Sequence, residues 1–213
     1  MSRGHSRRAG PARLLIVDDH AAIRAGLVAL LEGESALTLL PAAAGAEEAL
    51  RRARGQWPDI ALLDVSLADG DGLRLCLSLK RLPTPPPVLL YTASVDPLLG
   101  FKARLVGADG LIGKAARATA LVDAIAAVLR GDMTPPTFDR ALARERTEQL
   151  PPEAVAIVGL RLEGTPIDGT AEVLGLEQDE VLSRISGVLE LLDGEVSPND
   201  RRVRHPPRPG AVA

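Results

Sequence analysis

The chain of 213 residues contains one cysteine and three lysines, and it has no long uninterrupted apolar run. One thiol can form neither an internal disulfide nor a cysteine-based zinc site, so both are excluded. Because Cys76 falls among the regularly spaced leucines of residues 73–77, we expect it to be a buried, inert thiol. A membrane span needs roughly 18 uncharged apolar residues, and the basic N-terminus lacks a signal-peptide core. We therefore expect a cytoplasmic protein that binds no membrane.

The composition and the charge distribution limit the class of protein further. Hydrophobic residues make up 46% of the chain, which excludes disorder of the whole. The net charge of -3 hides a segregation along the sequence. Residues 150–195 hold ten acids against Arg161 and Arg184, a net of -8 (2 − 10), whereas residues 1–13 hold four arginines and no acid. Residues 196–213 hold four arginines and one acid. The acidic segment limits what the C-terminal part can bind.

Short apolar runs alternate with segments of helical period in the first part of the chain. The runs occupy residues 14–17, 37–40, 60–63, 88–91 and 110–112. This alternation is typical of βα units around a parallel sheet. We therefore predict an α/β fold, a (βα)5 doubly wound parallel sheet over residues 12–130, followed by a linker over residues 131–149.

Three short helical patterns follow the linker and predict a small all-α helix-turn-helix domain over residues 150–195. The patterns occupy residues 152–162, 166–173 and 178–191. Thr165 offers a hydroxyl N-cap with Pro166 at the first helical position, and Gly175 offers a left-handed C-terminal cap. Residues 1–11 and 196–213 are predicted to be disordered tails, because proline and arginine dominate the second and basic residues the first.

Polar side chains stand at the ends of the predicted strands, and parallel strands gather such ends in one crevice. Asp18 and Asp19 end the first run, Asp64 ends the third, Thr92 ends the fourth, and Lys114 lies just past the fifth. Three carboxylates at such short distances repel one another unless a cation lies between them. A site with oxygen ligands and open coordination positions suits Mg²⁺. We therefore expect a divalent metal, Mg²⁺, at this crevice.

Neighbouring polar residues have simpler explanations. Asp59 and Asp109 are expected to form turns or caps, as lone aspartates at strand ends usually do. His20 stands beside the acids and is expected to open the first helix rather than to bind the metal.

These residues resemble the receiver domain of bacterial two-component response regulators over the whole of residues 12–130. The resemblance is carried by the motifs Leu14-Leu-Ile-Val-Asp-Asp-His20, Asp59-Ile-Ala-Leu-Leu-Asp64, Asp69-Gly-Asp-Gly72, Tyr91-Thr-Ala93 and Gly107-Ala-Asp-Gly-Leu-Ile-Gly-Lys114. It implies that Asp64 is the phosphoacceptor and that a sensor histidine kinase is the phosphodonor.

The same resemblance implies roles for the other pocket residues. Asp19 and Asp64 would bind Mg²⁺ directly together with the backbone carbonyl of Ser66, and Asp18 would bind it through water. Lys114 would balance the charge of the phosphoryl oxygens, and Thr92 would donate a hydrogen bond to them.

Two positions of the receiver-like part depart from the family pattern. Ala68 replaces a proline, for which we expect a small effect, and Leu111 stands at the switch position where the family usually has Tyr or Phe. Leucine has no hydroxyl with which to reach the surface, so the signal would rest on Thr92 and the fourth helix.

Residues 150–192 resemble the output domain of the NarL and LuxR class at core and turn positions, visible in Leu150-Pro-Pro-Glu153, Ala171-Glu172 and Leu174-Gly-Leu176. At the recognition helix of that class, Glu180 takes the place of the usual Thr and Leu182 that of the usual Lys. Acids at a helix start repel the phosphates that supply most nonspecific DNA affinity. Arg184 is the one basic residue of this helix and is therefore the candidate DNA contact.

Two hypotheses for the function follow from these resemblances. The first is a transcription regulator that binds DNA through the helix-turn-helix after phosphorylation on Asp64, as a homodimer and without being an enzyme. The second is a phosphorylation-switched protein-binding module whose degenerate helix-turn-helix does not bind DNA. A phosphatase-like hydrolase is less consistent with the sequence, because Ser66 stands where such an enzyme has its general acid, two residues after Asp64.

Overall fold

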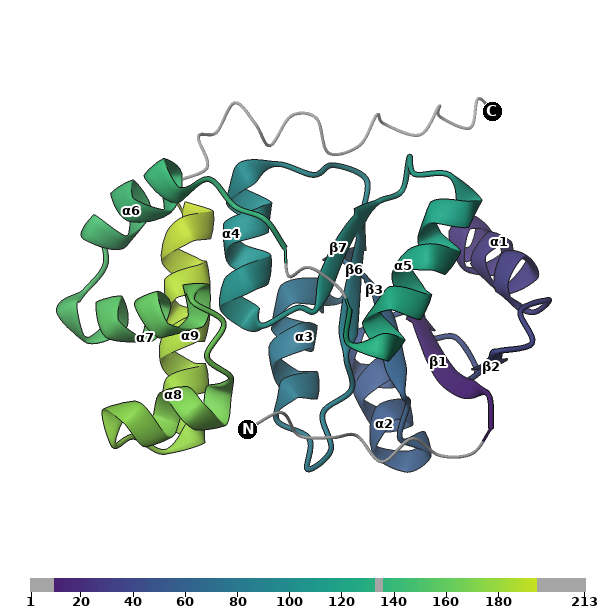
Figure 1. Cartoon of the computed structure of the whole chain (residues 1–213), viewed down its shortest axis with the longest axis horizontal. Helices are drawn as coiled ribbons and strands as arrows, with labels where there is room; N and C mark the ends of the chain where they lie inside the picture. Colours follow the sequence, from purple (N-terminus) through teal and green to yellow (C-terminus); the bar gives the residue numbers. More distant parts are fainter. Residues whose placement is uncertain (1–9, 133–135, 195–213) are drawn as a thin grey trace, which may run out of the picture.

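The structure is a computed structural model that describes residues 10–132 and 136–194 (Figure 1). The predicted disordered tails lie outside these ranges except for residues 10 and 11. The first part of the chain forms β1 (Ala12–Val17), α1 (Ala21–Leu31), β2 (Leu37–Leu39), α2 (Ala46–Gln56), β3 (Ile60–Asp64), β4 (Ser66–Leu67), β5 (Gly70–Asp71), α3 (Gly72–Lys80), β6 (Val88–Thr92), α4 (Pro97–Val106), β7 (Gly110–Gly113) and α5 (Ala118–Arg130). The second part forms α6 (Arg140–Glu148), α7 (Pro152–Leu162), α8 (Ile167–Leu174) and α9 (Gln178–Gly194).

Five parallel strands form one sheet in the order β2-β1-β3-β6-β7, which confirms the predicted doubly wound α/β fold. All five predicted apolar runs became strands of this sheet. The antiparallel pair β4 and β5 was not predicted, because each strand has two residues and shows no periodicity.

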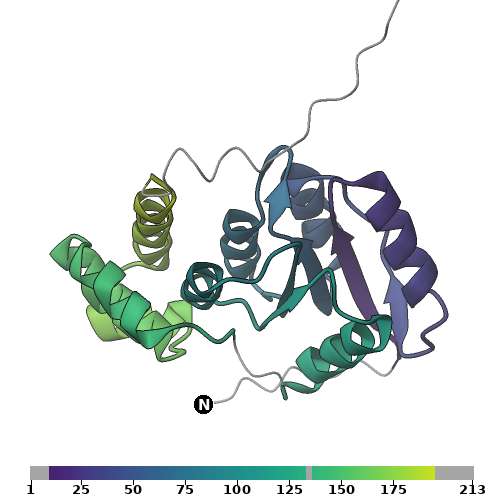
Figure 2. The ribbon, with the colours of Figure 1, turned by 90° about the horizontal axis from the view of Figure 1, so that it is seen from above.

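Helices cover both faces of the sheet (Figure 2). Successive residues of a strand point to opposite faces. Accordingly Leu14 and Ile16 pack with residues of α1 and α5, whereas Leu15 and Val17 pack with residues of α2, α3 and α4. The central strand β3 is buried along its whole length, as expected for a parallel strand covered on both sides.

The C-terminal helices lie close to where the sequence predicted them. Gly175 adopts the predicted left-handed conformation, with φ of 64°, at the end of α8. The predicted hydroxyl cap from Thr165 is wrong, because Pro166 occupies the N-cap position and no side chain caps this helix. The carbonyl of Thr165 instead accepts a hydrogen bond from Arg161.

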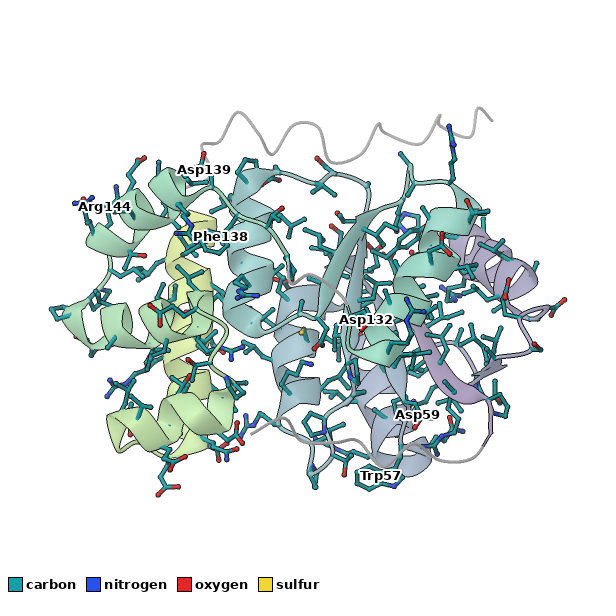
Figure 3. The ribbon with its side chains drawn as sticks, viewed as in Figure 1. Trp57, Asp59, Asp132, Phe138, Asp139 and Arg144 are labelled. Carbon is teal, nitrogen blue, oxygen red and sulfur yellow. The ribbon has the colours of Figure 1, made fainter. Side chains whose placement is uncertain are left out.

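The predicted linker contains the helix α6. Asp139 is its N-cap, and its carboxylate accepts hydrogen bonds from the N–H groups of Ala141 and Leu142 at 2.7 and 3.2 Å. Phe138 and Asp139 mark this entry into α6 (Figure 3). The linker was expected to end in a possible helix, and α6 confirms this.

The apolar core on the α2, α3 and α4 face continues into the C-terminal helices. One cluster of buried residues includes Phe101 of α4, Ile157 and Val158 of α7, and Leu189 of α9. The C-terminal helices and the sheet domain therefore share buried surface. Among the described residues, no helix is both long enough and apolar enough to cross a membrane.

Candidate functional site

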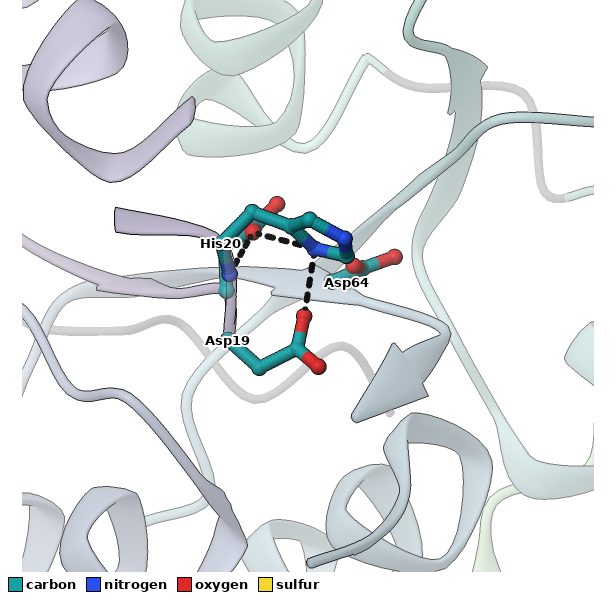
Figure 4. Close-up of side chains that lie close together, drawn as sticks. Asp19, His20 and Asp64 are labelled. Atoms are coloured by element: carbon teal, nitrogen blue, oxygen red, sulfur yellow. Dashed lines mark hydrogen bonds and ion pairs between the residues drawn. The ribbon is translucent and has the colours of Figure 1, made fainter. Parts of the chain in front are cut away.

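The carboxyl ends of β1 and β3 bring three aspartates together. Asp18 and Asp64 are 0% and 3% exposed, and Asp19 is half-buried beside them. Ligand atoms of Asp18, Asp19, His20 and Asp64 all lie within 4.8 Å of one another, and Figure 4 shows Asp19, His20 and Asp64. The predicted acidic cluster is thus present as a group of oxygens with one neighbouring imidazole.

Lys114, in the loop after β7, supplies the cation of the cluster. Its Nζ atom donates hydrogen bonds to Asp18 Oδ2 at 2.6 Å and to Asp64 Oδ2 at 2.8 Å. Burial alone would lower the pKa of Lys114, but the bonds to Asp18 and Asp64 outweigh it and raise that pKa above its usual value. Lys114 therefore stays charged and bridges two strands of the sheet.

The carboxylate of Asp64 is held at both oxygens. The N–H of Ser66 donates to Oδ1 at 3.2 Å, and Lys114 donates to Oδ2. Burial raises the pKa of Asp64 above its ordinary value, while Lys114 and the Ser66 N–H oppose the shift. One cation is not enough to offset the charges of three neighbouring aspartates, so the pocket favours the approach of a further cation.

His20 is the N-cap of α1, as predicted, and its imidazole lies over the acids. Its backbone N–H donates to Asp18 Oδ1 at 2.8 Å, and its Nδ1 lies 2.6 Å from Asp19 Oδ1. That oxygen of Asp19 is shielded from solvent and accepts no aligned hydrogen bond from the described residues.

Thr92 ends β6 next to the cluster, as predicted, but its hydroxyl is engaged in its own loop. Its Oγ1 donates to the carbonyl of Ser94 at 3.0 Å and accepts from the Ser94 N–H at 3.3 Å. The backbone N–H of Lys114 donates to the Thr92 carbonyl at 2.6 Å, which keeps the two residues adjacent. Leu111 is partly buried against the core on the α2, α3 and α4 face.

Asp59 and Asp109 lie outside the acidic cluster and form ion pairs, where turns or caps were expected, and the single cysteine is buried, as predicted. Asp59 accepts hydrogen bonds from Arg13, and Asp109 pairs with Lys80 at 2.7 Å. Cys76 is fully buried, and burial raises the pKa of its thiol to about 12, so it stays protonated.

Three of the four acids of α9 pair with basic residues of the sheet domain. Asp193 lies 2.5 Å from Lys102 of α4, Glu190 lies 3.2 Å from Arg74 of α3, and Asp179 pairs with Arg81 just beyond α3. The sequence analysis counted these acids in the net negative charge of residues 150–195 but could not identify their partners. Their partners lie about 90 to 120 residues away in the chain, so local pattern analysis could not find them.

Two arginines join α4 and α7 reciprocally. Arg161 of α7 donates from Nε to the Leu105 carbonyl, in the last turn of α4, at 3.0 Å. Arg104 of α4 donates from Nε to the Leu162 carbonyl, at the end of α7, at 3.0 Å. Cations are favourable at helix C-termini, so each helix end is stabilised by an arginine of the other helix. Arg161 was missed as a contact residue, although it stands in phase with the buried Ile157 and Val158.

Arg161 is only 4% exposed, and burial lowers the pKa of its guanidinium to about 10. A Cβ atom added at Gly107 would lie 2.1 Å from its Nη2. Gly107 and Arg161 therefore fit together closely, and the guanidinium has room only because Gly107 has no side chain.

In the predicted recognition helix, α9, the basic residue Arg184 is partly exposed and makes its contacts at the surface of the C-terminal helices. Arg184 donates to the Glu153 carbonyl at 3.2 Å and pairs with Glu180, both within the C-terminal helices. Leu182 is 4% exposed in the shared core. In this arrangement both positions are engaged within the protein.

Comparisons with known proteins agree with this architecture. The family described as "Response regulator receiver domain" matches residues 14–126. The DNA-binding transcriptional activator DevR/DosR of Mycobacterium tuberculosis is 35% identical over 114 residues, 53% of this chain and 52% of that protein. The chain therefore matches about half the length of this relative.

Two further matches extend the comparison. The probable transcriptional regulatory protein NarL of Mycobacterium tuberculosis is 28% identical over 175 residues, 82% of this chain and 73% of that protein. A crystal structure of a LuxR-family two-component response regulator from Aurantimonas sp. SI85-9A1 superposes with a TM-score of 0.57 at 30% identity, covering 64% of this chain and 99% of that one. With its receiver fold and these transcriptional relatives, the chain belongs to the two-component response regulators and is similar to those of the NarL and LuxR class.

Proposed function

We propose that Asp64 accepts a phosphoryl group from a sensor histidine kinase. The observation that carries this proposal is the pair of bonds from Lys114 Nζ to Asp18 and Asp64, at 2.6 and 2.8 Å. They support the proposal because they bring acids suited to a cation, a lysine suited to anionic oxygens and the buried carboxylate of Asp64 together at one end of the sheet. The match to the response regulator receiver family supports a histidine kinase as the donor.

Mg²⁺ is the proposed cofactor, and the residues present fit it. The cluster offers carboxylate oxygens, which hard divalent cations prefer, and one shielded oxygen of Asp19 accepts no aligned hydrogen bond. Asp19, Asp64 and the backbone carbonyl of Ser66 would hold the ion directly and Asp18 through water. When bound, the ion offsets the charge that phosphoryl transfer brings into the pocket.

The residues of the chain would then act in sequence. A carboxylate oxygen of Asp64 forms the new O–P bond while the P–N bond to the kinase histidine breaks and the imidazole keeps the electron pair. Lys114 moves from the two carboxylates to the transferred oxygens, because they carry the larger charge. The Thr92 hydroxyl exchanges its bond to the Ser94 carbonyl for one to a phosphoryl oxygen.

We assign residues 12–130 as the receiver, 131–149 as the linker and 150–195 as the output module. Because the relatives are transcriptional regulators, regulation of transcription is the first candidate output, with a homodimer formed on phosphorylation. DNA would have to reach α9, and its one basic residue, Arg184, would have to exchange its contacts with Glu153 and Glu180 for phosphates. This output is regulatory, and no substrate is turned over.

A second candidate is a protein-binding output without DNA contact. The contacts of α9 favour it, since Asp179, Glu190 and Asp193 pair with basic receiver residues. A helix face that binds a basic protein surface repels DNA phosphates.

A labelling experiment tests the phosphoacceptor. Incubation with a small phosphodonor and Mg²⁺ is followed by intact mass measurement. The wild type is expected to gain the mass of one phosphoryl group and Asp64→Asn to gain none. Asp69→Asn is the matched control, since Asp69 is an exposed acid that accepts a hydrogen bond from the Ala46 N–H. Labelling of Asp64→Asn would contradict the assignment.

A gel-shift assay separates the two outputs. The full chain is mixed with genomic fragments, with and without phosphodonor, across a salt series. Sequence-selective binding of the phosphorylated chain with a steep salt dependence supports the transcription regulator. Absence of binding at physiological salt supports the protein-binding module.

A further inference from the structure

Tyr91 is the only tyrosine of the chain, and its position in the sheet places it beside the acidic pocket. In the sheet register it lies opposite Asp64 of β3 on one side and Ile112 of β7 on the other. Its ring is half-buried and packs with Ile112 against the cluster on the α1 and α5 face. Lys114 follows the end of β7, two residues after Ile112, and its side chain approaches the Tyr91 ring.

The ring contacts the same ammonium group that bridges the carboxylates. Lys114 Nζ lies 5.5 Å from the centroid of the Tyr91 ring. A cation within about 6 Å of an aromatic centroid is attracted by the negative face of the ring. Two carboxylates and one aromatic face therefore define the position of Nζ.

We propose that Tyr91 is a positioning residue that holds the Lys114 ammonium over the pocket for phosphoryl transfer. The inference rests on the proposed phosphoacceptor function of Asp64. When the transferred group arrives, Lys114 must leave the two carboxylates for the new oxygens. The ring attracts the ammonium during this exchange and limits the conformations of its flexible four-carbon stem.

An aromatic ring suits this position better than an acid would. A further carboxylate near Lys114 would also hold the ammonium, but it would repel the incoming phosphoryl group and raise the pKa of Asp64. The ring attracts a cation without carrying a formal charge. It therefore holds the lysine without adding to the negative charge of Asp18, Asp19 and Asp64.

Two substitutions distinguish the contribution of the aromatic face of Tyr91 from those of its apolar bulk and its hydroxyl. Tyr91→Phe keeps the aromatic face, and Tyr91→Leu keeps an apolar side chain without one. Labelling rates are measured by intact mass with a small phosphodonor and Mg²⁺. We expect Tyr91→Phe to label within about twofold of the wild type and Tyr91→Leu to label about three- to tenfold more slowly. Ile112→Val is the matched control on the same face and is expected to label normally.

A second background tests whether Tyr91→Leu slows labelling because of its contact with Lys114. In Lys114→Met, the additional change Tyr91→Leu is expected to leave the labelling rate unchanged, because the ring has lost its cation. The near-ultraviolet tyrosine band gives a readout without labelling. In a Trp57→Phe background it reports Tyr91 almost alone, and it is expected to shift when Lys114→Met is introduced.

The outcomes distinguish this inference from the proposed function. Four outcomes would each overturn the positioning role while Asp64 remains the acceptor. Two are labelling results for the single variants: normal labelling of Tyr91→Leu, or equal slowing of Tyr91→Phe and Tyr91→Leu. The other two are an effect of Tyr91→Leu that is equally large in the Lys114→Met background, and a tyrosine band that does not shift. An unlabelled wild type would instead contradict the phosphoacceptor proposal, and the positioning role would fall with it.

Discussion

The protein has two acidic regions whose surroundings differ. In the receiver pocket Asp18 and Asp64 are almost fully buried and share one cation, Lys114. On α9 the acids are exposed, and Asp179, Glu190 and Asp193 each have a basic partner from the receiver. The pocket is left with negative charge, whereas these three α9 acids are matched one to one.

This difference shows that the number of acids in a segment does not determine its role. An excess of buried carboxylates favours a metal ion, because the charges cannot be screened by water. Exposed acids with separate partners form an interface, although exposed ion pairs contribute only about 0 to 1 kcal/mol each. Lys102 differs from the other two basic partners, because its side chain is 9% exposed.

Removal of divalent cations tests the pocket side of the comparison and carries the largest expected effect. Excess chelator is expected to abolish labelling by a small phosphodonor, because three neighbouring carboxylates repel an incoming phosphoryl group. Added Mg²⁺ is expected to restore it. Intact mass measures both states. Labelling that persists in chelator would mean that Lys114 alone offsets the charge.

Replacement of the buried arginine tests the interface side. Arg161→Met keeps much of the apolar stem but removes the donor to the Leu105 carbonyl and one of the two donors to the Thr165 carbonyl. An unsatisfied buried acceptor costs about 1 to 3 kcal/mol, so we expect the free energy of unfolding to fall by an amount in that range. Urea denaturation of the full chain measures it. Arg130→Met, at an exposed arginine, is the control and is expected to change little. Equal midpoints for the two variants would show that the contact between α4 and α7 does not stabilise the fold.

A double-mutant cycle on Lys102 and Asp193 has a smaller expected effect. Lys102→Ala, Asp193→Ala and the double variant are compared by urea denaturation. We expect a coupling free energy of about 1 kcal/mol, because one partner is nearly buried. The exposed pair Arg130 and Asp132 serves as the reference cycle and is expected to show less coupling. Equal coupling in both cycles would place the α9 contact among ordinary surface pairs.

The pH dependence of stability has the smallest expected effect. Burial raises the pKa of Asp64, so the folded state binds a proton more tightly than the unfolded state. The free energy of unfolding of the wild type therefore falls as pH rises from the unfolded pKa through the folded one. Asp64→Asn lacks this contribution. Without divalent metal, we expect the stability of Asp64→Asn relative to the wild type to be greater at pH 7 than at pH 4. The opposite order would show that Lys114 stabilises the ionised carboxylate more than burial destabilises it.

The sequence predicted the receiver pocket well because its geometry follows from local rules. Strand ends could be found from apolar runs, and a parallel sheet brings such ends together, so Asp18, Asp64 and Lys114 were placed without knowledge of any contact. The same logic located β3 and the crevice at its carboxyl end. It did not show that the Thr92 hydroxyl is bonded within its own loop, since this depends on loop conformation.

The interface of the C-terminal helices could not be predicted in the same way. Its contacts join residues far apart in the chain, such as Lys102 and Asp193, and depend on how two units pack. Leu182 and Arg184 were considered as DNA-facing positions because the helix was compared with a family pattern. In the structure Leu182 is buried and Arg184 bonds to Glu153 and Glu180. A substitution of Leu182 by lysine would therefore place a charge in the shared core.

Reductive trapping of the labelled protein tests the central claim most directly. The full chain is labelled with phosphodonor and Mg²⁺, and borohydride converts the acyl phosphate into homoserine before peptide mapping by mass spectrometry. The account predicts homoserine at position 64, in the peptide that contains Asp64, and an unmodified aspartate at positions 18, 19 and 69. Homoserine at any of those three positions, with Asp64 unmodified, would contradict it.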